Sequence, residues 1–286
     1  MKIKKSKKFY KSALCGALLA LMFNAGWAFA QKPQNIDLRY DVYTGGFKAL
    51  YADFDIKSDT GAYDIALEAR TQGVIGGLFP WQGFYRTAGH TKDNALVPAQ
   101  YTSRSIWKKK ESLTEISYGP DGEVLKTTTR DGTKTTTNRD IKRELTEDSV
   151  DLLTGTLLMM QSAKITDKCK GEIPVFDGKR RYNLVLEGDE MDTIRKSDYS
   201  VFSGQALKCT LKVKPVAGFK PKDQKRGWMA VQNHTLERGK PPTIWFAATE
   251  AGGPVVPVRM EINSDYGAAV AHLTASNSKV AKKASK

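Results

Sequence analysis

The sequence predicts an all-β, mainly antiparallel fold in which one curled or β-barrel-like sheet surrounds a single buried helix. Alternating apolar and polar residues, the pattern of half-buried strands, recur along most of the chain after its first thirty residues. Turn signals such as Asp131-Gly132 separate these runs, and that pair is typical of hairpins. A sheet of roughly a dozen twisted strands curls or splits in preference to staying flat.

The expected strands follow one another with short turns between them. Ile36, Leu38 and Tyr40 alternate with polar residues in the first strand, and Gly45-Gly46 turns the chain into a second strand that ends near Ile56. Further strands are expected at residues 63–69, 81–92, 100–109, 112–118, 124–130, 134–140, 181–187, 206–213, 229–236, 243–248, 255–262 and 268–273.

Residues 149–163 break the strand pattern. Leu153 and Leu157 lie four residues apart within a broad apolar face, which is the spacing of a helix. Ser149 suits the N-cap, and Asp151 suits the positive end of the helix dipole. We expect this to be the only long helix, buried against the mouth or the concave face of the curled sheet.

The first thirty residues are typical of a cleaved secretory signal peptide. Six lysines precede an apolar run at residues 13–23, and small residues flank Phe29 just before Gln31. The apolar run is too short to span a bilayer comfortably, although a retained membrane anchor is the alternative. We therefore expect a soluble periplasmic protein that begins near Gln31 and has no integral membrane span after cleavage.

An integral outer-membrane barrel would also combine a signal peptide with alternating strands. Its lipid-facing band would have to be apolar, whereas Lys108-Lys109-Lys110 and two threonine runs, at 127–129 and 135–137, interrupt the expected strands. The chain also ends in lysines in place of a final apolar strand. These features favour a soluble domain.

The charge distribution argues against nucleic-acid binding. The full chain has a formal net charge of +14, which falls to +8 when the first thirty residues, with six lysines and no acidic residue, are removed. Four more lysines lie in residues 279–286, which we expect to be a basic, disordered tail; contact with anionic lipid or glycan is the alternative. Residues 31–278 then form one nearly balanced domain, without the basic stripe that nucleic acid requires.

Cleavage would leave an even pair of cysteines, Cys169 and Cys209, in an oxidising compartment. We expect a disulfide, which would close a loop of about forty residues and stabilise the fold by about 4 kcal/mol in the chain-entropy model. Two buried thiols or half a metal site are the alternatives. Neither cysteine has a neighbouring cysteine or histidine at zinc-binding spacing.

Several motifs, taken in order, resemble one bacterial family. They are Tyr40-Asp41-Val42-Tyr43 before a Gly-Gly turn, the stretches 169–182, 203–209 and 215–219, Ile244-Trp245-Phe246, and Pro257-Val258-Arg259. Across most of the mature chain, their order and spacing are similar to those of the envelope proteins grouped as domain of unknown function 3108. The resemblance implies a periplasmic, β-barrel-like domain with no established activity, and it supplies no catalytic residues.

The stretch 176–181 has a structural and a functional interpretation. Phe176-Asp177-Gly178 is typical of a tight turn, in which the aspartate bonds to the backbone. In the functional interpretation, Lys179, Arg180 and Arg181 bind an acidic group, such as a phosphate on a glycan or lipid. We expect the structural role to dominate.

Residues 73–81 form a glycine-rich segment that does not alternate. Its large apolar residues are Val74, Ile75, Leu78, Phe79 and Trp81. We expect a bend packed inside the barrel. The alternative is an exposed lip that contacts acyl chains or a partner helix, because exposed apolar patches commonly mark interaction sites.

The sequence contains no recognisable catalytic or metal-binding motif. Its three histidines, His90, His234 and His272, are isolated, and Ser203-Gly204 lacks the Gly-x-Ser-x-Gly pattern of hydrolases. We expect a non-enzymatic protein without a cofactor or metal. The alternative is a hydrolase of envelope polymers that uses carboxylates from different strands, about 5 to 10 Å apart in an open cleft.

Export, the cysteine pair and the strand pattern together favour a role in maintaining the cell envelope. The expected partner is an envelope lipid, a glycan or an outer-membrane protein. The sequence leaves open whether side chains fill the barrel or a cavity remains. An apolar lumen of several hundred cubic ångströms would favour a lipid.

Overall fold

The computed structural model describes residues 34–59, 61–166, 168–225, 227–264 and 267–280. All of them belong to one compact unit. The predicted signal peptide, residues 1–30, lies outside the described part of the chain, as do residues 281–286 of the predicted basic tail.

Within the described residues, fourteen antiparallel strands form a single sheet that does not close into a barrel. The strands are β1 (Gln34–Thr44), β2 (Phe47–Ser58), β3 (Ala62–Thr71), β4 (Trp81–Lys92), β5 (Ala95–Trp107), β6 (Lys110–Tyr118), β7 (Val124–Asp131), β8 (Lys134–Asn138), β9 (Cys169–Phe176), β10 (Arg181–Ile194), β11 (Gly204–Ala217), β12 (Thr243–Ala248), β13 (Val255–Ser264) and β14 (Gly267–Val280). Their order is β8-β7-β6-β5-β4-β3-β2-β1-β14-β13-β12-β11-β10-β9, which leaves β8 and β9 at the two edges. The predicted fold class is therefore confirmed as a curled, open sheet.

The alternation in the sequence places one face of each long strand inside. Phe54 and Ile56 of β2 are buried, and Ile56 pairs with the buried Ile65 of β3 across the ladder. Lys57 and Glu68, on the opposite face of the same strands, are exposed. Because side chains alternate along a strand, this pattern gives the sheet one dry and one wet face.

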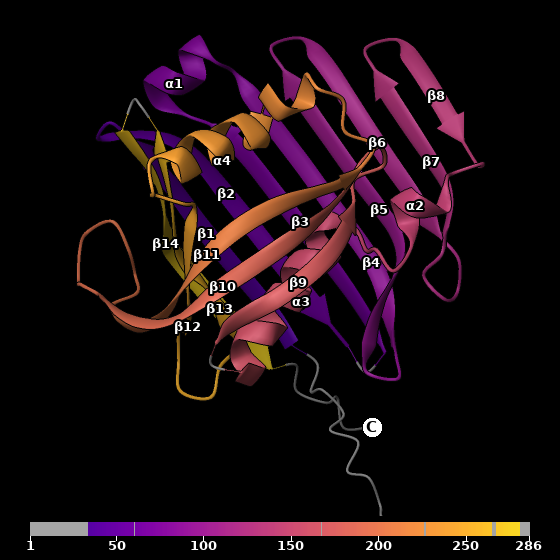
Figure 1. The fold of residues 1–286 in the computed structure, drawn as a ribbon. Helices are drawn as coiled ribbons and strands as arrows, with labels where there is room; N and C mark the ends of the chain where they lie inside the picture. Colours follow the sequence, from indigo (N-terminus) through magenta and orange to yellow (C-terminus); the bar gives the residue numbers. More distant parts are fainter. Residues whose placement is uncertain (1–33, 60, 167, 226, 265–266, 281–286) are drawn as a thin grey trace, which may run out of the picture. The chain divides into compact units, whose positions relative to one another are not determined.

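The sheet curls so that its two halves enclose the helix α3 (Leu152–Thr166). Figure 1 shows β2 to β6 on one side of this helix and β9 to β11 on the other. Apolar side chains from the helix and from both halves of the sheet form one core. Its most deeply buried members include Ile56, Ile65, Ile116, Leu153, Val175, Phe176, Val256, Val258 and Leu273.

The helix α3 begins three residues later than the sequence predicts. Asp151 is its N-cap, in place of the predicted Ser149: Oδ1 of Asp151 accepts hydrogen bonds from the backbone N–H groups of Leu153 and Thr154, both at 3.0 Å. Val150 instead forms a short parallel bridge with β9, which draws residues 149–150 out of the helix. The predicted burial of the helix against the concave face is confirmed.

A second long helix, α4 (Gly227–Glu237), replaces the predicted strand at residues 229–236. Met229, Gln232 and Thr235 are its buried residues, and their spacing of three is helical. The prediction was wrong because two of these three buried residues are polar, which hides the apolar stripe from a reading of the sequence. Shorter helical turns are α1 (Gly73–Leu78), α2 (Arg143–Thr146) and a 3-10 turn at Asp223–Lys225.

Several strand boundaries also differ from the prediction. The edge strand β9 was missed, since it contains Pro174 and Gly171, which are uncommon inside strands. The last strand, β14, extends to Val280 and pairs with β1, so the first two residues of the predicted tail belong to the sheet.

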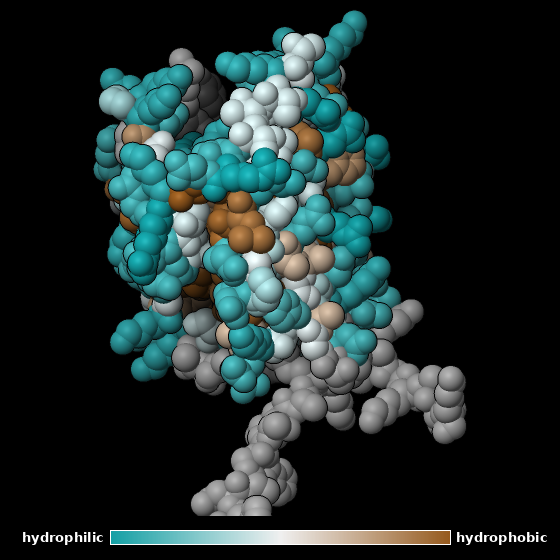
Figure 2. Space-filling model, turned by 90° about the vertical axis from the view of Figure 1, so that its right-hand side faces the viewer, coloured by the Kyte–Doolittle hydropathy of each residue, from teal (hydrophilic) through white to brown (hydrophobic). Residues whose placement is uncertain are grey.

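At the edge of the sheet opposite β9, the strand β8 ends at Asn138 and all its residues are exposed. Figure 2 shows the side of the molecule that carries β7 and β8 as largely hydrophilic.

A disulfide joins Cys169 in β9 to Cys209 in β11, as predicted. These strands are not neighbours, since β10 lies between them and a regular strand would separate them by about 9.5 Å. The two Cα atoms are only 5.5 Å apart. Gly188 permits this approach, because β10 bulges beside it and a Cβ at Gly188, whose φ is +128°, would lie 3.0 Å from the carbonyl oxygen of Lys208.

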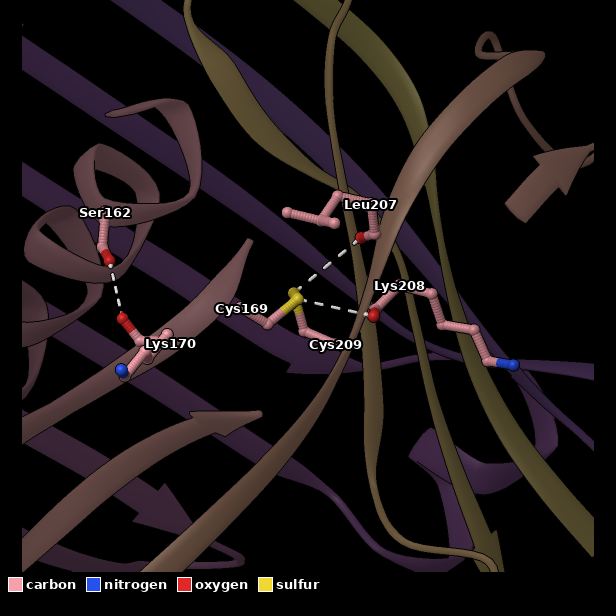
Figure 3. Close-up of a disulfide and its surroundings, with 6 residues drawn as sticks. All are labelled: Ser162, Cys169, Lys170, Leu207, Lys208 and Cys209. Carbon is pink, nitrogen blue, oxygen red and sulfur yellow. Dashed lines mark hydrogen bonds between the residues drawn. A yellow bond between two sulfur atoms is a disulfide. The ribbon is translucent and has the colours of Figure 1, made fainter. Parts of the chain in front are cut away.

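The surroundings of the disulfide tie it to the core (Figure 3). The hydroxyl of Ser162 in α3 donates a hydrogen bond to the carbonyl oxygen of Lys170, next to Cys169, at 3.4 Å. Both cysteines are buried. The crosslink therefore holds the start of β9 against β11, and the hydrogen bond from Ser162 holds it beside the helix.

Candidate functional site

An apolar cavity of about 630 Å³, partly open to solvent, lies within the curl of the sheet, and we call it the lumen. Both halves of the sheet and both long helices contribute to its wall. Its apolar side chains include Val42, Phe54, Leu211, Ile244 and Met260. A cavity of this size lies within the range of small-molecule binding sites, and an apolar wall suits an apolar ligand.

The helix α3 does not fill the lumen, because it packs against β9 at one side of the curled sheet. Gly155 lies against β9, where a Cβ would approach the side chain of Val175 to 3.0 Å. On the neighbouring face of the helix, Leu152, Thr156 and Met159 line the lumen. Their spacing of four and three places them on one helical face. The small residue at 155 therefore draws the helix to β9 and keeps the lumen open beside it.

The helix α4 covers part of the lumen. Trp228 and Met229, from its first turn, are among the lining residues. Gln232 attaches the helix to β11, where its Oε1 accepts a hydrogen bond from the backbone N–H of Val213 at 2.6 Å, and its Nε2 donates to the carbonyl oxygen of Val213 at 2.8 Å. The side-chain amide thus replaces a strand partner at a position of β11 that β12 does not reach.

Two tyrosines in the lumen wall have hydroxyl groups in an apolar environment. The hydroxyl of Tyr40 donates a hydrogen bond to the carbonyl oxygen of Pro257 at 2.7 Å, which satisfies its donor within the wall. Burial raises the pKa of Tyr40, and burial also raises the pKa of Tyr182. Both phenols are therefore neutral at physiological pH.

Arg180 brings a positive charge to this apolar wall. Its Nε donates to Oδ2 of Asp177 at 2.9 Å, and its Nη2 forms an ion pair with the same oxygen at 2.7 Å. The guanidinium lies over the ring of Phe219, 5.4 Å from the ring centroid. All three residues line the lumen, and 41% of the Arg180 side chain is exposed. The guanidinium is therefore held in position and keeps further N–H donors for a ligand.

The other two basic residues of the predicted anion-binding stretch lie elsewhere. Arg181 directs Nη1 to the carbonyl oxygen of Glu144, at 3.3 Å. Lys179 is exposed and lies near Asp131, whose pKa is lowered mainly by its hydrogen bond to Lys110 and more weakly by the charge of Lys179. Neither is a lumen residue, so the structure brings only Arg180 of the three to the cavity.

The apolar segment 73–81 is not packed inside the sheet as expected. Its first part forms α1, which has no buried residue, and the side chains of Val74, Leu78 and Phe79 are exposed. Ile75 and Trp81 are half-buried. The segment is therefore an exposed lip, which was the alternative interpretation of the sequence. The helix α1 has only six residues, three of which are glycines, so it has too few apolar side chains to pack into the core.

A second hollow, of about 710 Å³, lies on the wet face of β1 to β5, and we call it the outer groove. Asp37 and Asp55 face each other there across the β1–β2 ladder. Burial raises the pKa of Asp55, and the negative charges of Asp37 and Asp53 add to the effect. Asp53 is itself paired with Arg39, at 2.7 Å. The groove therefore gathers carboxylates, of which Asp53 is paired with an arginine.

Within the described residues, no group of three or more histidine, cysteine, aspartate or glutamate side chains is arranged to hold a metal ion. None of the helices in that part of the chain has the length and apolar character that a membrane span requires.

Sequence reasoning missed most of the lumen residues. Phe219 belongs to a motif that was noted without a role, and Trp228 lies just before residues 229–236, which were wrongly expected to form a strand. A lumen forms between segments far apart in the chain, such as β2, β11 and α4, so no local pattern marks it. The signal that could have been used is the pair of aromatic residues, Phe219 and Trp228, on either side of a lysine-rich loop.

The fold and the lumen together define a class of protein: an open, curled β-sheet that wraps a buried helix beside an apolar cavity. Residues 39–274 match the family described as "Protein of unknown function (DUF3108)", and the chain belongs to that family. No curated protein matches the chain. A solved structure, the β-barrel-like protein of domain of unknown function DUF1849 from Brucella abortus, is 12% identical with a TM-score of 0.42, covering 87% of this chain and 98% of its own.

Proposed function

We propose that this protein is a non-enzymatic, soluble protein of the periplasm that contributes to envelope maintenance by binding an envelope lipid in its lumen. The single observation that carries the proposal is the apolar cavity of about 630 Å³ between α3, α4 and the sheet. The predicted signal peptide and the disulfide between Cys169 and Cys209 support the compartment.

A lipid suits the lumen better than the other two predicted partners. A glycan needs many hydrogen-bonding side chains, whereas the lumen wall is mostly aliphatic and aromatic. A protein partner would use the outer surface. Each buried methylene of an acyl chain contributes about 0.8 kcal/mol, so a long chain readily offsets the cost of association.

Arg180 supports a lipid with an anionic head group. The acyl chain would lie among Phe54, Leu211 and Met260, and the head group would meet the guanidinium that Asp177 and Phe219 hold in place. Arginine forms strong, charge-assisted hydrogen bonds with carboxylate and phosphate oxygens. A fatty acid or a lysophospholipid combines the two chemistries.

The test is a binding titration of a fatty acid and a lysophospholipid, followed by intrinsic fluorescence or calorimetry. Ala52→Trp, in the lumen wall, should weaken binding of both at least tenfold, since the indole occupies space that the chain needs. Ala95→Trp, at an exposed position of β5, is the matched control and should bind as the wild type does. Equal affinity in all three proteins, or no binding by the wild type, would show the proposal to be wrong.

The variant Arg180→Gln distinguishes the contribution of the head group to binding from that of the acyl chain. We expect this variant to lose affinity for the fatty acid while it keeps affinity for the corresponding fatty alcohol, which has no charge. An equal loss for both ligands would contradict the role of the guanidinium.

The outer groove supports a second candidate, hydrolysis of an envelope polymer. The carboxylates of Asp37 and Asp55 come from directly paired positions, where cross-strand Cβ atoms are about 5 Å apart, close to the spacing of retaining glycosidases. The raised pKa of Asp55 favours a proton donor. Release of soluble fragments from purified peptidoglycan by the wild type, but not by Asp55→Asn, would support this activity. No release by the wild type would exclude it.

A further inference from the structure

The outer surface of the sheet carries a second feature, independent of the lumen, in the exposed lip around α1. Five large apolar side chains are between 48% and 65% exposed in this region: Phe47, Val74, Leu78, Phe79 and Trp107. They come from three separate connections of the sheet, the β1–β2 turn, the β3–β4 connection and the β5–β6 turn. We call these five side chains the apolar cap.

The topology places these connections at one end of the sheet. In an antiparallel meander from β1 to β8, every second turn lies at the same end, so the β1–β2, β3–β4, β5–β6 and β7–β8 connections share it. Figure 1 shows α1 at this end. The rings of Phe79 and Trp107 are 6.4 Å apart, and the backbone N–H of Lys108 donates to the carbonyl oxygen of Pro80 at 2.9 Å. The cap is therefore continuous across neighbouring connections.

The exposure of the cap is built into the fold. The hydroxyl of Thr71 donates to the carbonyl oxygen of Phe79 at 2.9 Å and accepts from the backbone N–H of Trp81 at 2.9 Å. The backbone N–H of Gln72 donates to the carbonyl oxygen of Ala49 at 2.8 Å. These bonds fix both ends of the segment to β2 and β3, so its apolar side chains are held outward.

The two ends of the meander carry opposite charges. At the capped end, Lys108 and Lys109 are exposed and form no ion pair with any described residue, while Lys110 is paired with Asp131 at 2.9 Å. At the other end, the β2–β3, β4–β5 and β6–β7 turns are acidic. Their acidic residues are Asp59, Asp93, Asp121 and Glu123, of which Asp121 is paired with Lys92 at 2.6 Å. Within the described residues, the capped end therefore combines five exposed large apolar side chains with unpaired positive charge, whereas Leu125 is the single large exposed apolar side chain near the other end of the meander.

We propose that the capped end docks on the surface of a lipid bilayer that contains anionic lipids. Exposed aromatic and aliphatic side chains enter the boundary between head groups and acyl chains, and tryptophan favours that depth. Lysines beside them are attracted to anionic head groups. The acidic turns at the far end are repelled by the same surface, which orients the molecule with α1 toward the membrane.

The test uses vesicles of phosphatidylethanolamine and phosphatidylglycerol in equal parts, with vesicles of phosphatidylcholine for comparison. The wild type should sediment with the anionic vesicles at low salt, and binding should weaken as salt is added. Brominated lipids should quench the tryptophan fluorescence of the bound protein, and the quenching should be weaker in Trp107→Phe. Absence of sedimentation with the anionic vesicles at low salt would overturn the proposal.

Three variants separate the parts of the cap. Leu78→Ser with Phe79→Ser should weaken vesicle binding about tenfold, and Lys108→Glu with Lys109→Glu should weaken it at least as much and remove its salt dependence. Leu125→Ser is the matched control, because Leu125 is equally exposed, at 49%, but lies on β7 outside the cap. Cap variants that bind vesicles as the control does would overturn the proposal.

The docking surface and the lumen can fail separately. Ala52→Trp, which fills the lumen, should bind vesicles as the wild type does, because the cap does not include β2 beyond Phe47. The cap variants should keep their affinity for a dispersed fatty acid.

Discussion

Replacement of Asp151 by alanine should destabilise the protein by about 3 kcal/mol. The carboxylate accepts four hydrogen bonds: from the backbone N–H groups of Leu153 and Thr154, both at 3.0 Å, and from the hydroxyls of Thr154 at 2.7 Å and Thr87 at 2.9 Å. Loss of an N-cap costs about 1 kcal/mol, and loss of charge-assisted bonds to the hydroxyls costs about 2 kcal/mol more. The same bonds fix α3 to β4, so the lumen would also lose its inner wall.

Asp151→Asn is the conservative partner of that variant. The amide oxygen can still cap the helix, and the two threonine hydroxyls can turn to accept from the amide nitrogen, so the loss should be about 1 kcal/mol. Urea unfolding with the disulfide intact measures both variants. A loss below about 1 kcal/mol for Asp151→Ala would show that the helix is held by apolar packing alone and would refute the reasoning.

The difference in stability between the wild type and Asp151→Asn should depend on pH in a direction set by the pKa of Asp151. Burial raises the pKa of Asp151 above its ordinary value of 3.8, and its four hydrogen bonds only partly oppose the shift. The folded protein thus holds this proton more tightly than the unfolded chain does. The contribution of Asp151 is fully present below about pH 3.8 and declines as the pH rises through the raised pKa. The stability of the wild type relative to Asp151→Asn should therefore fall with pH over that window, and a rise would contradict the shift.

Three further predictions concern the crosslink, the second helix and the ligand. Joint replacement of Cys169 and Cys209 by serine should lower the free energy of unfolding by about 4 kcal/mol, measured by urea unfolding, and Gly188→Ala should lower it too, because alanine is strained at φ +128°. Gln232→Leu should increase hydrogen exchange at Val213 and in α4, because it removes both bonds to β11; unchanged exchange would show that packing alone holds the helix. For saturated fatty acids, each added methylene should lower Kd about fourfold until the lumen is full, and affinity independent of chain length would contradict burial of the chain.

The N-terminal half of the fold was accessible to sequence reasoning because its information is local. The alternation of Phe54 and Ile56 with charged residues identifies a strand, and glycine-containing turns separate it from its neighbours. The disulfide was also predictable, since Cys169 and Cys209 are the two cysteines that remain after the first thirty residues.

The parts that were missed depend on contacts between distant segments. The edge strand β9 contains Pro174, which is tolerated because its neighbour on that side is the irregular segment at Val150 and not a full strand. In α4, the buried Gln232 bonds to β11, so its burial follows from a tertiary contact that no local pattern contains. The lumen depends on Gly155 drawing α3 toward β9, which is likewise invisible before the helix and the strand are placed together.

The most direct test of the lumen as a lipid site is methyl NMR of the protein labelled at its methionines, titrated with a long-chain fatty acid. Met159, Met229 and Met260 line the cavity, whereas Met191 is exposed on β10, away from it. We predict saturable shifts of the three lumen methyl groups and no shift of Met191. Shifts confined to Met191, or no saturable shift at the three lumen residues, would contradict the account.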